Sequence, residues 1–304
     1  MRIIFMGTPD FAVASLKALL EVGENVVAVV TAPDKPAGRG QKLQQSAVKF
    51  FAEAHNLPVL QPEKLRDPNF IETLKSYNAD LQVVVAFRML PEIVWNMPPM
   101  GTINVHASLL PQYRGAAPIN HAIINGEKES GVTTFLLQHE IDTGNILLAS
   151  KVDINDNDTA GILHDNLMVA GADTLIKTIN GLRDKTITPI PQAEFTEEEL
   201  KHAPKIFKED CLIDWDNSTD KIFNLIRGLS PYPTAFTHLN NKFLKIFEAE
   251  KQIVNHQLPP GEFQTDEKSF LKFATNDGFI NLKVIQIEGK KRMEINEFLK
   301  GYRF

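Results

Sequence analysis

The chain has 304 residues and a formal net charge of −6, with 43% apolar and 23% charged residues. These proportions are those of a globular protein and exclude a disordered or fibrous chain. No apolar run approaches the roughly 20 residues that a membrane-spanning helix requires, and the first apolar run is too short for a signal peptide. The single cysteine, Cys211, excludes an internal disulfide framework. We therefore expect a cytoplasmic protein.

The charge is unevenly distributed along the chain. Residues 206–304 are neutral by formal count, so residues 1–205 carry the whole net charge. An acidic protein can bind a polyanion only through local basic patches. From composition alone, such patches are ordinary solvated surface. Two are present: Lys35, Arg39 and Lys42 in one loop, and Lys290, Lys291 and Arg292 near the end of the chain.

Residues 1–187 alternate between apolar strands and amphipathic helices. Strands that are almost wholly apolar and separated by helices predict a parallel sheet covered on both faces. We therefore expect an α/β fold with a Rossmann-like, mostly parallel sheet, which binds ligands at the carboxyl ends of its strands. Strands are expected at residues 2–6, 25–31, 81–87, 102–105, 132–138 and 146–152, and helices at residues 11–21, 45–55, 65–75 and 159–179, with Asp10 capping the first.

The pattern changes after residue 187. Residues 188–205 are rich in proline and acidic residues and read as a linker with a single helical turn. Residues 206–304 then contain one helix and about five short strands separated by turn residues, which predicts a small OB-like β-barrel. The helix is expected at residues 218–227 and the strands at residues 234–239, 243–248, 261–264, 270–274 and 279–286.

Three polar side chains at strand ends suggest chemistry. Asn104 and His106 are two residues apart, so in a strand their side chains leave the same face. Asp142 is followed by Thr-Gly, which permits a tight turn. An amide can donate to an oxyanion, an imidazole can carry a proton, and a carboxylate can orient that imidazole. This set fits acyl transfer to a substrate amine, with no nucleophile from the protein. A core histidine and a turn aspartate remain the alternative interpretation of the spacing.

The residues around this set resemble a known family. The string HASLLPQYRGAAPI, which starts at His106, is similar to the signature of the folate-dependent formyltransferases. The strings IFMGTPDFA from Ile4, PDKPAGRG from Pro33 and IRGLSPYPTAF from Ile226 resemble the same family, as does the Asp-Thr-Gly at Asp142. The basic loop and the second domain resemble most closely the branch that acts on methionyl-tRNA. The similarity extends over nearly the whole chain and is weakest in the final third.

The resemblance implies a reaction and a set of residues. The reaction transfers a formyl group from 10-formyltetrahydrofolate to the α-amine of methionine on initiator tRNA, for translation initiation and without a metal. The catalytic residues fall on Asn104, His106 and Asp142. The stretch associated with the folate site falls on Ser108, Leu109, Leu110 and Pro111.

The resemblance also implies partners and domains. The loop with Lys35, Arg39 and Lys42 is expected to contact the acceptor end of the tRNA, and Lys290, Lys291 and Arg292 to add contacts from the barrel. The domains are expected at residues 1–187 (catalytic), 188–205 (linker) and 206–304 (tRNA-contacting). Nothing in the sequence marks an oligomeric state, so a monomer is the default expectation.

Three other functions are open at this point. A formyltransferase for a sugar-nucleotide amine or a glycinamide ribonucleotide shares the catalytic and folate residues, but the basic loop and the second domain favour tRNA. A nicotinamide-dependent dehydrogenase is disfavoured because the first turn, MGTPD, has one glycine followed by proline instead of a glycine-rich fingerprint. A non-catalytic RNA-binding module leaves Asn104, His106 and Asp142 unexplained.

Overall fold

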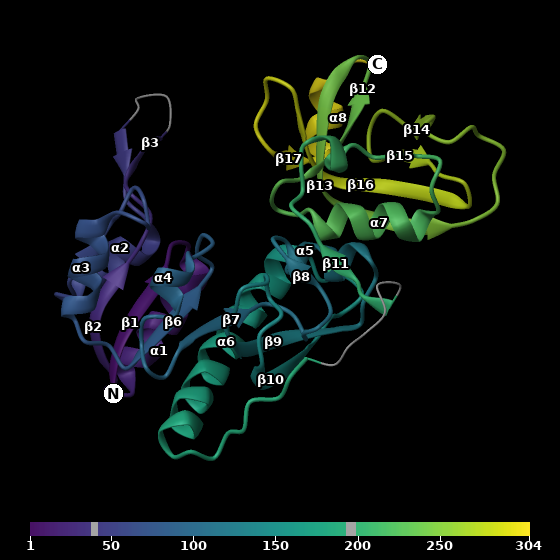
Figure 1. Ribbon diagram of the computed structural model, residues 1–304. Helices are drawn as coiled ribbons and strands as arrows, with labels where there is room; N and C mark the ends of the chain where they lie inside the picture. Colours follow the sequence, from purple (N-terminus) through teal and green to yellow (C-terminus); the bar gives the residue numbers. More distant parts are fainter. Residues whose placement is uncertain (38–41, 193–198) are drawn as a thin grey trace. The chain divides into compact units, whose positions relative to one another are not determined.

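The computed structural model describes residues 1–37, 42–192 and 199–304, which form two compact units. Figure 1 follows the chain through both. The predicted contiguous domains, 1–187, 188–205 and 206–304, divide the chain more simply than these units and stay a prediction. Unit 1 comprises Met1–Gly115, Ser130–Val152 and His164–Lys201, and unit 2 comprises Ala116–Glu129, Asp153–Leu163 and His202–Phe304.

Unit 1 is built on a seven-stranded sheet with the order β10-β9-β7-β6-β1-β2-β5. The strands from β5 to β7 are parallel, and β9 runs antiparallel to β7. This confirms the predicted α/β fold with a mostly parallel sheet. The strands are β1 (Arg2–Gly7), β2 (Asn25–Val30), β5 (Val59–Leu60), β6 (Leu81–Val85), β7 (Thr102–His106), β9 (Glu129–Leu136) and β10 (Ile146–Asp153).

Helices cover both faces of this sheet, as predicted. Ile4, Met6 and Val84 point to one face and pack with α3 (Pro68–Ser76) and α4 (Glu92–Trp95). On the other face α6 (Ala160–Arg183) approaches β7 closely, since a Cβ on Gly171 would lie 3.4 Å from Val105. The remaining helices of unit 1 are α1 (Asp10–Glu21) and α2 (Ala47–Ala54).

One predicted helix cap is wrong. Pro9, with an extended backbone, is the N-cap of α1, and Asp10 is the first helical residue. The Asp10 carboxylate accepts a hydrogen bond from the adjacent Phe11 N–H at 3.0 Å. A capping side chain instead accepts from an N–H two or three residues further on. Asp10 therefore contributes a negative charge to the first turn, where the helix dipole favours it.

Several short elements carry too few residues to give a pattern in the sequence. They include a hairpin of β3 (Lys35–Ala37) and β4 (Lys42–Gln44), in which Lys35 pairs with Gln44. The helix α5 (Pro118–Ile124) begins with a proline, which suits the first helical turn. The others are β8 (Arg114–Gly115), β11 (His202–Ala203), the 3₁₀ turn at Glu209–Cys211, β17 (Met293–Glu294) and α8 (Ile295–Gly301).

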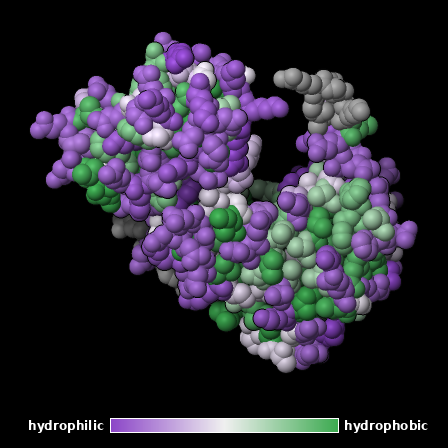
Figure 2. Space-filling view, turned by 180° about the vertical axis from the view of Figure 1, so that it is seen from behind, coloured by the Kyte–Doolittle hydropathy of each residue, from purple (hydrophilic) through white to green (hydrophobic). Residues whose placement is uncertain are grey.

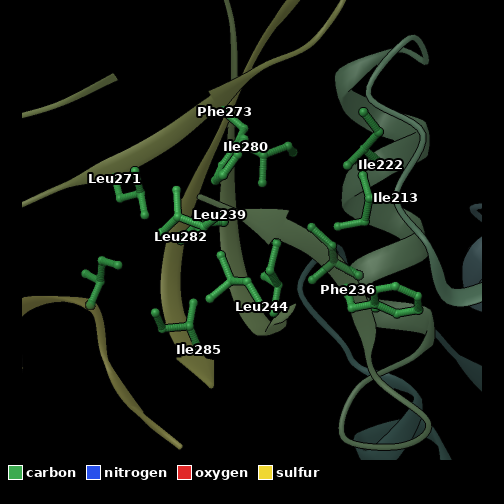
Figure 3. Packing of buried hydrophobic residues seen from close by; sticks show 14 of the residues in the cluster. Ile213, Ile222, Phe236, Leu239, Leu244, Leu271, Phe273, Ile280, Leu282 and Ile285 are labelled. Atoms are coloured by element: carbon green, nitrogen blue, oxygen red, sulfur yellow. The ribbon is translucent and has the colours of Figure 1, made fainter. Parts of the chain in front are cut away.

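Unit 2 contains an antiparallel sheet with the order β12-β13-β16-β15-β14, to which β17 adds beside β16. Figure 3 shows its core, where Leu244, Ile280 and Ile285 pack with Ile222 from α7 (Thr219–Gly228). This confirms the predicted small β domain. Its sheet forms a half-barrel and not a closed barrel, because no strand pairing in the described ranges joins β12 to β14. The strands are β12 (Ala235–Leu239), β13 (Lys242–Ile253), β14 (Phe263–Thr265), β15 (Leu271–Ala274) and β16 (Gly278–Ile287).

A segment from the middle of the chain also belongs to unit 2. The helix α5 packs against α7, where the Asn120 side chain donates to the Gly228 carbonyl at 2.7 Å. Gly228 permits this approach, since a Cβ there would lie 2.6 Å from Ile124. Side-chain packing therefore explains why unit 2 is not a contiguous stretch.

The surface is mixed in character. On the face drawn in Figure 2, hydrophilic residues cover most of the surface, and apolar residues gather in smaller patches. Phe50, Met89 and Tyr232 are among the large apolar side chains that are mostly exposed. None of the helices in the described ranges is long and apolar enough to cross a membrane.

Candidate active site

The carboxyl end of β7 presents two polar side chains on one face. Asn104 pairs with Phe135 of β9, and His106 pairs with Thr133, so both leave the sheet on the face opposite to Val105 and α6. His106 is buried, whereas Asn104 is only partly buried. Among the described residues, the Asn104 amide has no hydrogen-bond partner. Its NH₂ group is therefore free to donate to a ligand.

A hydrogen bond from one ring nitrogen holds His106, and its other ring nitrogen faces a carboxylate. Nε2 lies 3.0 Å from the carbonyl oxygen of Tyr113, and because a carbonyl can only accept, Nε2 carries the hydrogen. Nδ1 lies 3.9 Å from Oδ2 of Asp142. Both side chains are nearly buried, at 8% and 12% exposed, so solvent screens their interaction weakly. The 3.9 Å separation leaves Nδ1 and Oδ2 able to bind the same third group.

The turn that carries Asp142 has a defined geometry. Asp142 adopts a positive φ of 55°, and its Oδ2 accepts a hydrogen bond from the Gly115 N–H at 3.0 Å. Gly144 is required two residues later, because a Cβ there would lie 1.6 Å from the carbonyl oxygen of Leu136. The Asp-Thr-Gly sequence therefore packs tightly against the end of β9 and directs the carboxylate towards His106.

The stretch that the resemblance assigns to the folate site follows β7 directly. Thr133 of β9 holds it, since its hydroxyl donates to the Ser108 carbonyl at 2.7 Å and accepts from the Leu110 N–H at 3.1 Å. Ser108 and Leu110 are buried, and Leu109 and Pro111 are partly exposed. The Ser108 hydroxyl donates to the Gln112 carbonyl at 2.7 Å, so its proton is engaged within the same loop.

The first basic cluster lies on the β3–β4 hairpin. Lys35 is exposed. Arg39 lies outside the described residues, and the placement of the Lys42 side chain is not described either. Asp34, the only acid in this loop, pairs instead with Lys49 at 2.6 Å, and this hydrogen bond is the main reason that the pKa of Asp34 is lowered. Because its carboxylate pairs with Lys49, Asp34 does not form an ion pair with Lys35.

The second basic cluster is partly engaged within unit 2. Lys290 and Lys291 are exposed. Arg292 stacks on the ring of Phe247, with its guanidinium carbon 4.4 Å from the ring centroid, and its Nη2 lies 3.1 Å from the Glu248 carboxylate. Because a neighbouring carboxylate offsets the charge of Arg292, the two lysines are the stronger candidates for contacts with phosphate.

Several atoms of the site have no signature in the sequence. The Tyr113 carbonyl and the Gly115 N–H are backbone groups, which every residue carries. Thr133 reads as an ordinary strand residue. The loop after β6 begins with Ala86 at a positive φ of 47° and exposes Met89 at the same carboxyl edge of the sheet. The sequence offers one sign that this loop belongs to the site, which is its position directly after a buried strand.

The fold and the site define an α/β protein with an amide, an imidazole and a carboxylate at the carboxyl edge of a parallel sheet. The family model described as formyl transferase matches residues 1–179, and the one described as formyl transferase, C-terminal domain, matches residues 205–303. The chain therefore belongs to the formyl transferase family, a family of enzymes, which confirms the resemblance seen in the sequence.

Close relatives share the whole length of the chain. The methionyl-tRNA formyltransferase of Bacteroides thetaiotaomicron is 53% identical over 309 residues, covering 100% of this chain and 96% of the relative. That of Parabacteroides distasonis is 55% identical over 311 residues, covering 100% and 96%.

Solved structures show the same fold at lower identity. The sugar 3N-formyl transferase WlaRD, solved with dTDP and 5-N-formyl-THF, matches with a TM-score of 0.67 and 22% identity, covering 96% of this chain and 99% of that one. The methionyl-tRNA formyltransferase from Clostridium thermocellum matches with a TM-score of 0.57 and 18% identity, covering 83% and 94%.

Proposed function

We propose that this protein transfers the formyl group of 10-formyltetrahydrofolate to the α-amine of methionine on initiator methionyl-tRNA. Relatives with that name are 53% to 55% identical over essentially the whole chain, which supports the choice of substrate. The chemistry is carried by one observation. The side-chain amide of Asn104 has no hydrogen-bond partner among the described residues. It lies two residues from the buried imidazole of His106, which faces the carboxylate of Asp142.

Asn104 supplies the oxyanion donor in this proposal. The lone pair of the substrate amine attacks the formyl carbon, a C–N bond forms, and the formyl oxygen becomes an oxyanion. The free NH₂ of Asn104 donates to this oxygen. An oxyanion donor of this kind is worth on the order of 10²–10³ in rate.

His106 and Asp142 manage the protons. Nε2 of His106 keeps its hydrogen on the Tyr113 carbonyl, so a second proton is carried on Nδ1. There it can stabilise the same oxyanion, while the Asp142 carboxylate stabilises the imidazolium. Asp142 accepts the proton released by the attacking amine, directly or through a water. The oxyanion then re-forms the formyl C=O as the bond from the formyl carbon to N10 of the folate breaks, and N10 takes the proton that Asp142 received from the amine. General acid–base help of this kind contributes roughly 10²–10⁴ in rate.

The remaining predicted residues bind the two substrates. The backbone of Ser108 and Leu110, with the side chains of Leu109 and Pro111, forms part of the folate site beside the catalytic residues. Residues 1–187 carry the chemistry and residues 206–304 contact tRNA, joined by residues 188–205. The basic residues that contact tRNA are Lys35, Arg39, Lys42, Lys290, Lys291 and Arg292. The protein acts in the cytoplasm as a monomer.

A turnover assay tests this proposal. Purified protein is incubated with methionyl-tRNA and 10-formyltetrahydrofolate, and acid-gel or mass analysis of the esterified amino acid reports formylmethionine. Parallel reactions replace the tRNA with amino-sugar nucleotides or free methionine. We expect product only with the aminoacylated tRNA. Absence of product, or faster formylation of an amino-sugar nucleotide, would refute the proposal.

A second experiment tests the tRNA contacts. Arg39→Ala is expected to raise KM for methionyl-tRNA and to leave KM for the folate donor unchanged, since Arg39 pairs with phosphate or stacks on a base. Lys290→Ala with Lys291→Ala should weaken tRNA binding and flatten its salt dependence, because fewer counterions are released. Equal losses for both substrates, or an unchanged salt slope, would contradict a role in tRNA binding.

A further inference from the structure

The start of the predicted linker is docked on the sheet of unit 1. Ile190 pairs with Ile146, the first residue of β10, through two backbone hydrogen bonds of 2.8 and 2.9 Å. This bridge fixes the path of the chain two residues before Gln192. Gln192 is thereby placed against the turn that carries Asp142, fifty residues away in the sequence.

The nitrogen and the oxygen of the Gln192 side-chain amide both form hydrogen bonds. Its Nε2 donates to the carbonyl oxygens of Asp142 at 2.8 Å and Gly144 at 2.9 Å. Its Oε1 accepts from Nε of Arg114 at 3.1 Å and from Nη2 at 2.5 Å. Since a guanidinium can only donate, Arg114 fixes which end of the amide faces the turn.

These contacts close a ring of interactions around the Asp142 carboxylate. Arg114 orients Gln192, Gln192 binds the Asp142 carbonyl, and the carboxylate of Asp142 accepts from the N–H of Gly115, the neighbour of Arg114. Asp142 has a positive φ of 55°, in the left-handed region that residues other than glycine adopt infrequently. The two hydrogen bonds from Gln192 flank Thr143 and hold the turn in this conformation.

We infer that Gln192, oriented by Arg114, is a positioning residue that holds Asp142 facing His106. This inference rests on the proposed function, because it gives Asp142 a role in the reaction. Gln192 acts on the reaction through Asp142, so its loss lowers kcat and leaves substrate binding unchanged. The segment between the two predicted domains thus supplies a part of the catalytic site.

Two substitutions test the inference by kinetics. Gln192→Ala removes both donors. Gln192→Glu keeps the volume and the acceptor for Arg114 but loses the donors to the turn. We expect each to lower kcat by about 10- to 100-fold, the range found when residues that orient a metal ligand are replaced. KM for both substrates should change by less than about twofold. Gln252→Ala, on the exposed part of β13, is the matched control and should keep wild-type kcat.

A double substitution separates positioning from a general structural role. In an Asp142→Asn background, Gln192→Ala should produce little further loss, because residues that act through one another are not additive. The same fold-loss in both backgrounds would overturn the inference, as would a kcat of Gln192→Ala within twofold of wild type. Gln192→Glu keeps the test available where the alanine variant fails to fold.

One readout does not depend on the substrate. Hydrogen exchange at the Gly115 amide reports its bond to the Asp142 carboxylate. Exchange at Gly115 should be at least tenfold faster in Gln192→Ala than in wild type, with exchange in β1 unchanged. Unchanged protection at Gly115 would overturn the inference even in an active enzyme. Absence of formyl transfer by the wild type, with faster exchange at Gly115 in the variant, would instead refute only the proposed function.

Discussion

The hydroxyl of Thr133 joins β9 to the stretch between Ser108 and Leu110 through two hydrogen bonds. It is fully buried, donates to the Ser108 carbonyl at 2.7 Å and accepts from the Leu110 N–H at 3.1 Å. Thr133→Val keeps the shape of the side chain and leaves these two backbone groups without their partner. Each buried polar group left unpaired costs about 1–3 kcal/mol, so for two groups we expect a loss of about 2–6 kcal/mol in the free energy of unfolding of unit 1.

The loss can be measured in unit 1 alone. The chain has two tryptophans, and in a Trp215→Phe background the fluorescence of Trp95 follows urea unfolding of unit 1. KM for the folate donor should rise in the same variant, because the stretch assigned to the folate site loses its support.

Two control substitutions show how much of the loss in stability comes from the buried hydroxyl. Thr133→Ser keeps the hydroxyl and should cost no more than about 1 kcal/mol, the value of one buried methyl group. Thr73→Val removes an exposed hydroxyl that donates to the Asn69 carbonyl within α3, and it should change stability by less than about 0.5 kcal/mol. A Thr133→Val protein within about 0.5 kcal/mol of wild type would contradict the role of this hydroxyl as a buried hydrogen-bond partner.

Two further predictions concern unit 2. The Asp277 carboxylate accepts from the N–H and hydroxyl of Thr219 at the start of α7, and these bonds lower the pKa of Asp277. Asp277→Ala should therefore cost about 1 kcal/mol in urea unfolding at pH 7, and the cost should shrink as the pH falls below about 4; a constant difference from pH 7 to pH 2 would contradict this. Burial raises the pKa of Cys211, whose side chain is 3% exposed, so less thiolate is present at pH 8. Its labelling by iodoacetamide at pH 8 should be at least tenfold slower in the native protein than in urea, and equal rates would contradict its burial.

The fold and half of the site follow from local patterns in the sequence. The apolar strands and the helical spacing predict the parallel sheet because burial on both faces leaves a period that can be read along the chain. The shared face of Asn104 and His106 follows from the two-residue period of a strand. The choice of Asp142 follows from the Thr-Gly that comes after it and from the family resemblance.

The rest depends on contacts between distant parts of the chain. Gln192 lies in a proline-rich stretch that reads as a linker, and only its docking beside β10 shows that it contacts the Asp142 turn. The carbonyl of Tyr113 holds His106 through a backbone atom, which no residue type signals. The cap predicted at Asp10 is wrong because the preceding proline already has the extended backbone of an N-cap. The residue types alone do not decide which of the two residues is the N-cap.

The role of the Asn104 amide is tested by the kcat of Asn104→Ala with saturating methionyl-tRNA and 10-formyltetrahydrofolate. Asn104 is partly exposed and has no hydrogen-bond partner in the described ranges, so its removal should leave the fold intact. We expect a folded protein with kcat lowered by a factor of about 10²–10³. A folded Asn104→Ala protein that turns over at near the wild-type rate would show that this amide does not stabilise the oxyanion.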